Sequence, residues 1–135
     1  MNRFVLCLLP LGLMACLPED PPKLPLAPAG DVAIPAALHG RWGLSEAECT
    51  ADPAIAKGLM TVDATTLVFY ESRGSLIDVA QSGPTRLEGS FAFVGEGQTW
   101  ARQETLDLQD EGRVLIRREY GEGAAPGPFR YFACP

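Results

Sequence analysis

Residues 85–97 read TRLEGSFAFVGEG, and apolar and polar side chains alternate along this run before it ends in a glycine-rich turn. Alternation with a period of two is typical of a β-strand that buries one face. The expected inner face carries Leu87, Phe91 and Phe93, and the expected outer face carries Arg86, Glu88 and Ser90. Glycines in Gly95-Glu96-Gly97 supply the left-handed backbone that a tight hairpin turn needs. The run therefore predicts one arm of an antiparallel hairpin.

Short apolar runs separated by turn residues extend outward from this hairpin in both directions. The expected strands are residues 39–44, 59–63, 66–72, 76–80, 85–94, 99–108, 113–120 and 129–134. Ser45 and Glu48 have the spacing of a capping box, and Asp52-Pro53 is typical of a helix start that would end at Gly58. Several short strands at regular spacing predict an all-β fold. We expect a small antiparallel meander or barrel of seven to eight strands with one short helical turn.

The first fifteen residues have the pattern of a secretory signal, with Arg3 followed by an apolar core from Phe4 to Ala15. This core is too short to cross a bilayer of about 30 Å at about 1.5 Å per residue. Leu13-Met14-Ala15-Cys16 resembles the lipobox of bacterial lipoproteins. The resemblance implies cleavage before Cys16 and lipidation of its thiol, so that the protein is anchored to a membrane. The alternative is a conventional signal peptide that is cut elsewhere.

Five prolines lie between Leu17 and Ala33, a density that excludes helix and paired strand. Proline-rich chain is extended at about 3.1 Å per residue, so this segment could hold a domain roughly 50 Å from a bilayer. We expect a signal peptide at 1–15, a lipid-anchored tether at 16–33 and a β domain at 34–135. Leu17, which follows the lipobox, implies export to the outer membrane, with the domain facing the periplasm.

Two of the four cysteines remain for the folded domain, because Cys7 lies in the signal and Cys16 in the lipobox. Cys49 and Cys134 lie 85 positions apart, and in an oxidising compartment they predict one disulfide. Closing such a loop is worth about 4 to 5 kcal/mol in the chain-entropy model. The chain has no C-x-x-C motif and one histidine, so we expect no metal site and no cofactor.

The net charge of the chain and its lack of common catalytic motifs bear on which classes of function we expect. A formal net charge of −6 argues against a nucleic-acid partner, which favours a basic face. The sequence contains no G-x-S-x-G elbow, no H-E-x-x-H pair and no phosphate-binding glycine loop before a helix. We therefore expect a binding protein rather than an enzyme.

Gly40-Arg41-Trp42 resembles the G-x-W signature that opens lipocalin-like barrels. Together with Gly43-Leu44-Ser45 and the nearby Cys49, it is also similar to the start of small periplasmic metalloprotease-inhibitor barrels. In lipocalins a late arginine packs over the tryptophan, which implies that role for Arg130. The chain as a whole resembles small lipoproteins of alphaproteobacteria, a likeness that implies a location but no activity.

Strand alternation places charges toward the barrel interior. If Trp100, Leu106 and Leu108 face inward, so do Arg102 and Glu104, and if Val114 and Ile116 face inward, so do Arg118 and Tyr120. Buried charges need partners, so Glu104 would pair with Arg102 or Arg118. With Trp100 and Tyr120, this cluster could hold a small polar ligand in the barrel mouth. Alternatively, a β-bulge between Trp100 and Leu106 returns the charges to solvent, or they sit at the barrel end.

A second candidate lies where an aromatic ring, a carboxylate and a guanidinium meet at a strand end, at Tyr70, Glu71 and Arg73. This combination is common at interface hot spots, although a solvated strand end fits it as well. Arg117-Arg118-Glu119 is typical of the charges that protect an edge strand.

The sequence supports three functional hypotheses. The first is recognition of another envelope protein, with inhibition as one form of it. The second is a lipocalin-like carrier of a small ligand inside the barrel, and the third is a structural accessory of an envelope complex. An interior filled by Trp42, Phe91, Phe93 and Trp100 would leave a carrier no room for cargo.

Overall fold

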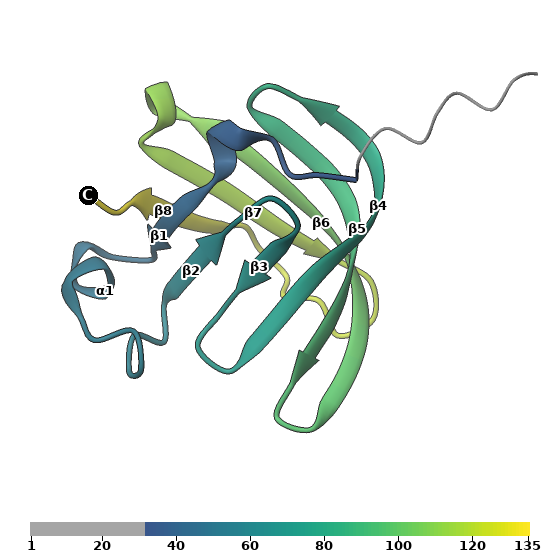
Figure 1. Cartoon of the computed structure of the whole chain (residues 1–135), viewed down its shortest axis with the longest axis horizontal. Coiled ribbons are helices and arrows are strands. Elements are labelled where there is room, and N and C mark those ends of the chain that lie inside the picture. The colour runs from purple at the N-terminus through teal and green to yellow at the C-terminus, as the bar shows by residue number, and fades with distance from the viewer. Residues whose placement is uncertain (1–31) are drawn as a thin grey trace, which may run out of the picture.

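Eight antiparallel strands close into a barrel in the computed structural model, which describes residues 32–135 (Figure 1). Each strand pairs with the next along the chain, and the last pairs with the first. The strands are β1 (Gly40–Gly43), β2 (Leu59–Val62), β3 (Thr66–Val68), β4 (Ser72–Gly83), β5 (Arg86–Gly95), β6 (Gln98–Gln109), β7 (Val114–Tyr120) and β8 (Phe129–Ala133). The 3-10 helices η1 (Ala36–Leu38) and η2 (Asp110–Gly112) and the helix α1 (Glu46–Thr50) complete the described chain. The expected all-β meander is confirmed as a closed barrel.

The predicted signal peptide, Cys16 and nearly all of the tether lie outside the described residues. The first described residue, Val32, precedes η1 by a few positions. The structure therefore bears on the expected β domain and leaves the lipoprotein interpretation as a prediction.

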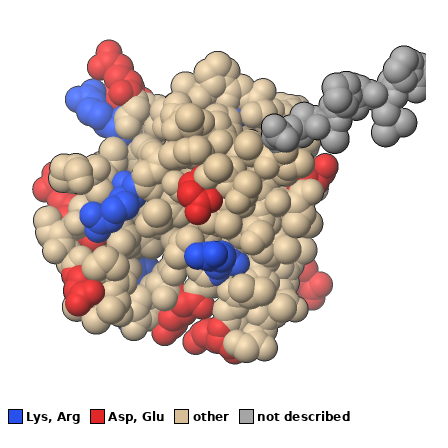
Figure 2. All heavy atoms as spheres, viewed as in Figure 1, with Lys and Arg blue, Asp and Glu red and all other residues tan. Residues whose placement is uncertain are grey.

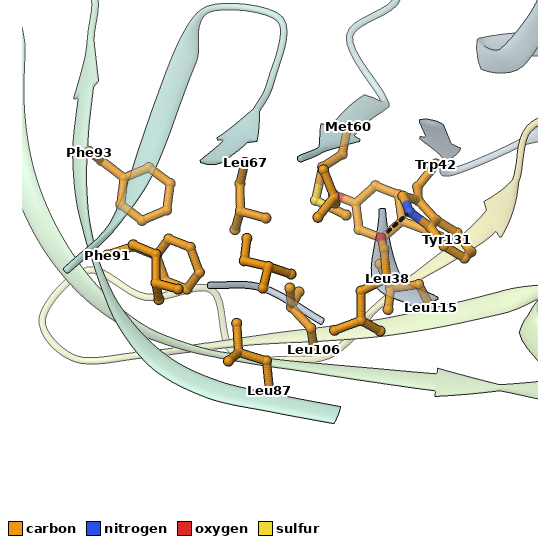
Figure 3. Packing of buried hydrophobic residues seen from close by; sticks show 13 residues of the cluster. Leu38, Trp42, Met60, Leu67, Leu87, Phe91, Phe93, Leu106, Leu115 and Tyr131 are labelled. Carbon is orange, nitrogen blue, oxygen red and sulfur yellow. Dashed lines mark hydrogen bonds between the residues drawn. The ribbon is translucent and has the colours of Figure 1, made fainter. Parts of the chain in front are cut away.

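The segment before β1 closes one end of the barrel. The backbone N–H of Ile34 donates to the carbonyl of Ala64 in the β2–β3 turn at 2.7 Å, and Leu38 is completely buried. The indole of Trp42 donates to the Leu38 carbonyl at 3.0 Å, drawn as the dashed line in Figure 3. In Figure 1, η1 lies at the same end as the β4–β5 and β6–β7 turns. We name this the closed end, and the end with the β3–β4 and β5–β6 turns the open end.

The hydrophobic core fills the middle of the barrel, with side chains from all eight strands and from the segment before β1 (Figure 3). Its fully buried members include Leu67, Leu87, Phe91, Leu106 and Leu115. Strand alternation directs these side chains inward, as the period-two pattern predicts. The arginine expected over Trp42 is not found there: Arg130 is exposed, and its guanidinium lies 5.5 Å from the ring of Phe132.

Strand β4 is longer than the expected run at residues 76–80 and absorbs the end of the expected run at 66–72. Its pairing with β5 shifts register between Leu76 and Asp78 and again between Val79 and Gln81. Each shift is a β-bulge, which adds a residue to one strand and bends it. The bulges break the alternation, so the sequence pattern shows only part of this strand.

The helical turn lies earlier than expected, in α1 rather than at residues 52–58. Ser45 precedes α1 without a side-chain capping bond, so the predicted capping box does not form. Asp52 instead organises a single turn: its carboxylate accepts from the N–H of Ala54 at 2.9 Å and its carbonyl from that of Ala56 at 3.0 Å. The chain must enter β2 at Leu59, which pairs with Gly43, so this turn is not extended into a helix.

The predicted disulfide between Cys49 and Cys134 is confirmed, with 5.2 Å between the two Cα atoms. It joins α1 to the residue after β8, and the N–H of Cys134 donates to the Arg41 carbonyl of β1 at 2.9 Å. The crosslink therefore sits at the junction of the first and last strands.

Replacing both cysteines, as Cys49→Ala/Cys134→Ala, should lower the free energy of unfolding by about 2 to 5 kcal/mol, because the unfolded chain regains loop entropy. Urea unfolding in non-reducing buffer measures the change. Reducing the wild-type protein should cause a similar loss. Equal unfolding midpoints for oxidised wild type and double variant would show that the crosslink does not stabilise the barrel.

Candidate functional site

A cavity of about 210 Å³ opens at the open end of the barrel. One part of its wall is aromatic and consists of Phe69, Phe93 and Trp100. The other part is polar and consists of Ser72, Arg102, Glu104, Arg117 and Glu119. The β3–β4 connection and strands β4 to β7 supply these residues, so the cavity is built by the framework of the barrel.

Arg102 and Glu104 point into the barrel, as the alternation along β6 predicts. The β5–β6 register runs without a break from Arg86–Asp107 to Gly95–Gln98, so the alternative of a bulge between Trp100 and Leu106 is wrong. Glu104 has no exposed surface, whereas the side chain of Arg102, nearer the end of the barrel, keeps 15% of its surface exposed. The alternative prediction, that these charges lie at the end of the barrel, is therefore correct for Arg102 and wrong for Glu104.

The inward-facing charges of β7 differ from the expected ones. Arg118 and Tyr120 face outward and are exposed, whereas Leu115 and Arg117 are buried and Glu119 is largely buried. The prediction assigned the wrong set of alternate residues in β7 to the barrel interior. Val114 and Leu115 are both buried, so the start of the strand does not show which set faces inward. The edge-strand interpretation of Arg117 is also wrong, because β7 pairs with a strand on each side.

Arg117 is the centre of a buried ion cluster. Its Nη2 donates to Glu104 Oε1 at 2.9 Å and to Glu119 Oε1 at 2.7 Å. Arg102 Nη1 donates to the second oxygen of Glu119 at 3.4 Å, a long contact. The Arg117 guanidinium also lies 4.6 Å from the ring centre of Phe69 and 5.2 Å from that of Phe129, so two aromatic faces offset part of its lost hydration.

Two buried polar atoms of this cluster have no hydrogen-bond partner within the described chain, namely Glu104 Oε2 and Arg117 Nε. Burial raises the pKa of the Glu104 carboxyl to about 7, although attraction to Arg117 opposes the shift. For Arg117, burial is the largest single effect and favours loss of the proton, but the attraction and hydrogen bond of Glu104, together with attraction to Tyr131 and Glu119, outweigh it and raise the guanidinium pKa. The arginine therefore stays charged, while Glu104 is divided between its two protonation states near neutral pH.

The aromatic part of the wall is held in a fixed arrangement. The rings of Phe93 and Trp100 stack with 5.4 Å between centres and 5° between planes, and Phe69 lies 6.3 Å from Phe93. Gly74 pairs with Phe93 across β4 and β5, and a Cβ at this glycine would meet the ring at 2.6 Å. The absent side chain therefore lets Phe93 lie flat over β4.

The second predicted cluster does not form a joint site. Tyr70 is half-buried with the Lys57 ammonium 5.6 Å from its ring centre, whereas Glu71 and Arg73 are exposed. Among residues 32–135, no hydrogen bond or ion pair links these three side chains. Sequence reasoning missed Phe69, Ser72, Arg117 and Glu119. The run Leu115, Arg117, Glu119, at a spacing of two, was the available signal for the last two.

In the described part of the chain, no three His, Cys, Asp or Glu side chains gather closely enough to hold a metal ion. Within the same residues, no helix has the length and apolarity needed to span a bilayer. No family model, curated protein or solved structure matches this chain. The fold is thus that of a small eight-stranded barrel with a disulfide, and the likenesses to lipocalins and to protease inhibitors remain resemblances of the opening motif.

Replacing Glu104 with glutamine should change how stability depends on pH. The ordinary pKa of the group is 4.5 and its folded value about 7, so between these pH values the folded state holds a proton that the unfolded chain has released. The free energy of unfolding of the wild type should therefore fall by about 3 kcal/mol as the pH rises through this range. Urea unfolding at several pH values measures the fall, which Glu104→Gln should abolish.

Glu71→Gln, which removes an exposed carboxyl, is the matched control and should keep the wild-type profile. Parallel profiles for wild type and Glu104→Gln would refute the raised pKa of Glu104.

Proposed function

We propose that this protein is a lipid-anchored envelope lipoprotein whose barrel binds another envelope protein through its open end. The lipobox at Leu13–Cys16, the proline-rich tether and a disulfide between distant cysteines all suit an exported, anchored domain. The observation that carries the binding proposal is the cavity at the open end, where buried charges face an aromatic wall.

The packed interior argues against the carrier hypothesis in its original form. Phe91, Leu87 and Leu106 are fully buried in the middle of the barrel, where lipocalin-like cargo would lie. Trp42 and Phe93 are also buried, and Trp100 packs against the core. A binding site at the mouth is therefore better supported than one deep inside.

Exposed apolar side chains toward the open end of the barrel favour a protein partner. Within residues 32–135, four of the seven large exposed hydrophobic residues lie in connections or strand ends on this side: Leu44, Ile55, Val94 and Tyr120. Figure 2, which has the view of Figure 1, shows one side of the barrel as a mostly uncharged surface. Such a surface suits a contact made by apolar and aromatic anchors with a polar centre.

A photo-crosslinking amino acid at Tyr120, at the end of β7, should join the protein to its partner in intact cells. The matched control is Ile77, which is also exposed but lies on the side wall in β4. We expect one discrete crosslinked species from position 120 and none from position 77, as judged by immunoblotting. Equal crosslinking from both positions, or none from Tyr120, would contradict recognition through the open end.

Cys16→Ala should abolish lipidation, because the thiol is the proposed acceptor of the lipid. Metabolic labelling with an alkyne fatty acid, followed by membrane fractionation, measures the effect. We expect the wild type to be labelled and to sediment with outer membranes, and the variant to lose both properties. Retention of the label by Cys16→Ala would refute the lipobox assignment.

A further inference from the structure

The two unpartnered atoms of the ion cluster both lie on side chains that line the cavity, Glu104 and Arg117. Both side chains are more than nine-tenths buried, so bulk water does not hydrate them freely. The two groups are joined by the 2.9 Å contact between Arg117 Nη2 and Glu104 Oε1, and both residues line the same cavity. The cavity wall therefore offers hydrogen-bonding capacity that the described chain leaves unused.

We propose that the cavity binds a small monocarboxylate that carries an aromatic or other compact apolar group, with the carboxylate against Arg102, Arg117 and Glu104. This inference rests on the proposed function in placing the binding site at the open end, and it specifies the chemistry recognised there.

The balance of charge around the cavity favours an anion. With Glu104 protonated, the cluster contains the cations Arg102 and Arg117 and the anion Glu119, and so carries one net positive charge. With Glu104 ionised the cluster is neutral, so in neither state does it attract a cation. Protonated Glu104 and Arg117 Nε–H are both donors, and a carboxylate supplies two acceptor oxygens.

Other groups near Glu104 do not reverse this balance. Tyr131 of β8 keeps its proton, because burial raises the pKa of its phenol. Strand β5 places Gly89 opposite Glu104, so it adds no charge there. Arg102 makes one side-chain hydrogen bond within the described residues, the 3.4 Å contact through Nη1, and so has donors left for a ligand.

The size and wall of the cavity define the rest of the ligand. A cavity of about 150 Å³ holds benzene in another protein, so 210 Å³ suffices for one aromatic ring and a carboxylate. The Trp100 ring, which is partly exposed and is stacked on the buried ring of Phe93, offers an apolar surface for that ring. Such a carboxylate has two sources, a free aromatic acid or the C-terminus of a protein that ends in an apolar residue.

Titration calorimetry on the purified, detergent-solubilised protein tests the inference with benzoate, benzamide and benzylammonium. At pH 6 we expect benzoate to bind at least about tenfold more tightly than either of the other two probes. Its affinity should fall about tenfold between pH 6 and pH 8, because binding requires the proton on Glu104, whose pKa is about 7. Benzamide binding as tight as that of benzoate, or no benzoate binding at about 10 mM, would overturn the proposal.

Three variants locate the site. Arg102→Gln should weaken benzoate binding at least about tenfold, because it removes a cation from the cavity. Glu104→Gln should retain binding but lose its pH dependence, because the amide donates at every pH. Arg86→Gln removes an exposed arginine of β5 near the closed end and should change neither property. An unchanged affinity in Arg102→Gln would overturn the assignment of the site.

Peptides that end in phenylalanine identify the source of the carboxylate. If the peptide with a free C-terminal carboxylate binds more tightly than benzoate, and the same peptide with an amidated C-terminus does not bind, the site recognises a protein C-terminus. If benzoate binds and the peptide is excluded, the site takes a free acid; either result supports the carboxylate. Crosslinking from Tyr120 without binding of any carboxylate would refute this inference alone, whereas benzoate binding without crosslinking would refute the proposed protein partner.

Discussion

The pairing of β1 with β8 closes the barrel, and every interior position depends on it. This seam is short, with the two residue pairs Trp42–Ala133 and Gly43–Phe132. Three further links reinforce it: the Cys49–Cys134 disulfide, the bond from the Cys134 N–H to the Arg41 carbonyl, and the 3.2 Å bond from the Arg41 side chain to the Cys49 carbonyl. A closed barrel leaves no unpaired strand edge. The disulfide therefore does more than limit the unfolded chain, because it reinforces a seam that has two residue pairs.

The ion cluster has a different place in the energetics of the fold. A buried ion pair often contributes little net stability, because desolvation offsets the attraction between the charges. Here Arg117 satisfies two carboxylates with one nitrogen and lies between two aromatic rings, while one atom of Glu104 stays unpaired. An apolar pair of the same size would fill this end of the barrel without such a cost. The small contribution of the cluster to stability is compatible with the binding role proposed for it.

Most of the framework could be predicted from the sequence, and the exceptions have identifiable causes. The β5–β6 hairpin was predicted well because its register is regular and one of its faces is apolar. Strand β4 was predicted short because two bulges interrupt its alternation. Arg117 was missed because Val114 and Leu115 are both buried, and only pairing with β6 and β8 decides which of them faces inward. The unpaired atoms of Glu104 and Arg117 depend on three-dimensional packing and leave no trace in sequence spacing.

The segment before β1, with Ile34 and Leu38, closes one end of the barrel and also marks the end at which the described chain enters it. The described chain enters the barrel at this closed end (Figure 1), whereas the cavity lies at the open end. If Cys16 is the anchor, the tether reaches the barrel at its closed end, so the cavity lies at the end of the barrel away from the point of attachment. The cavity is then open to molecules that approach from the space around the protein.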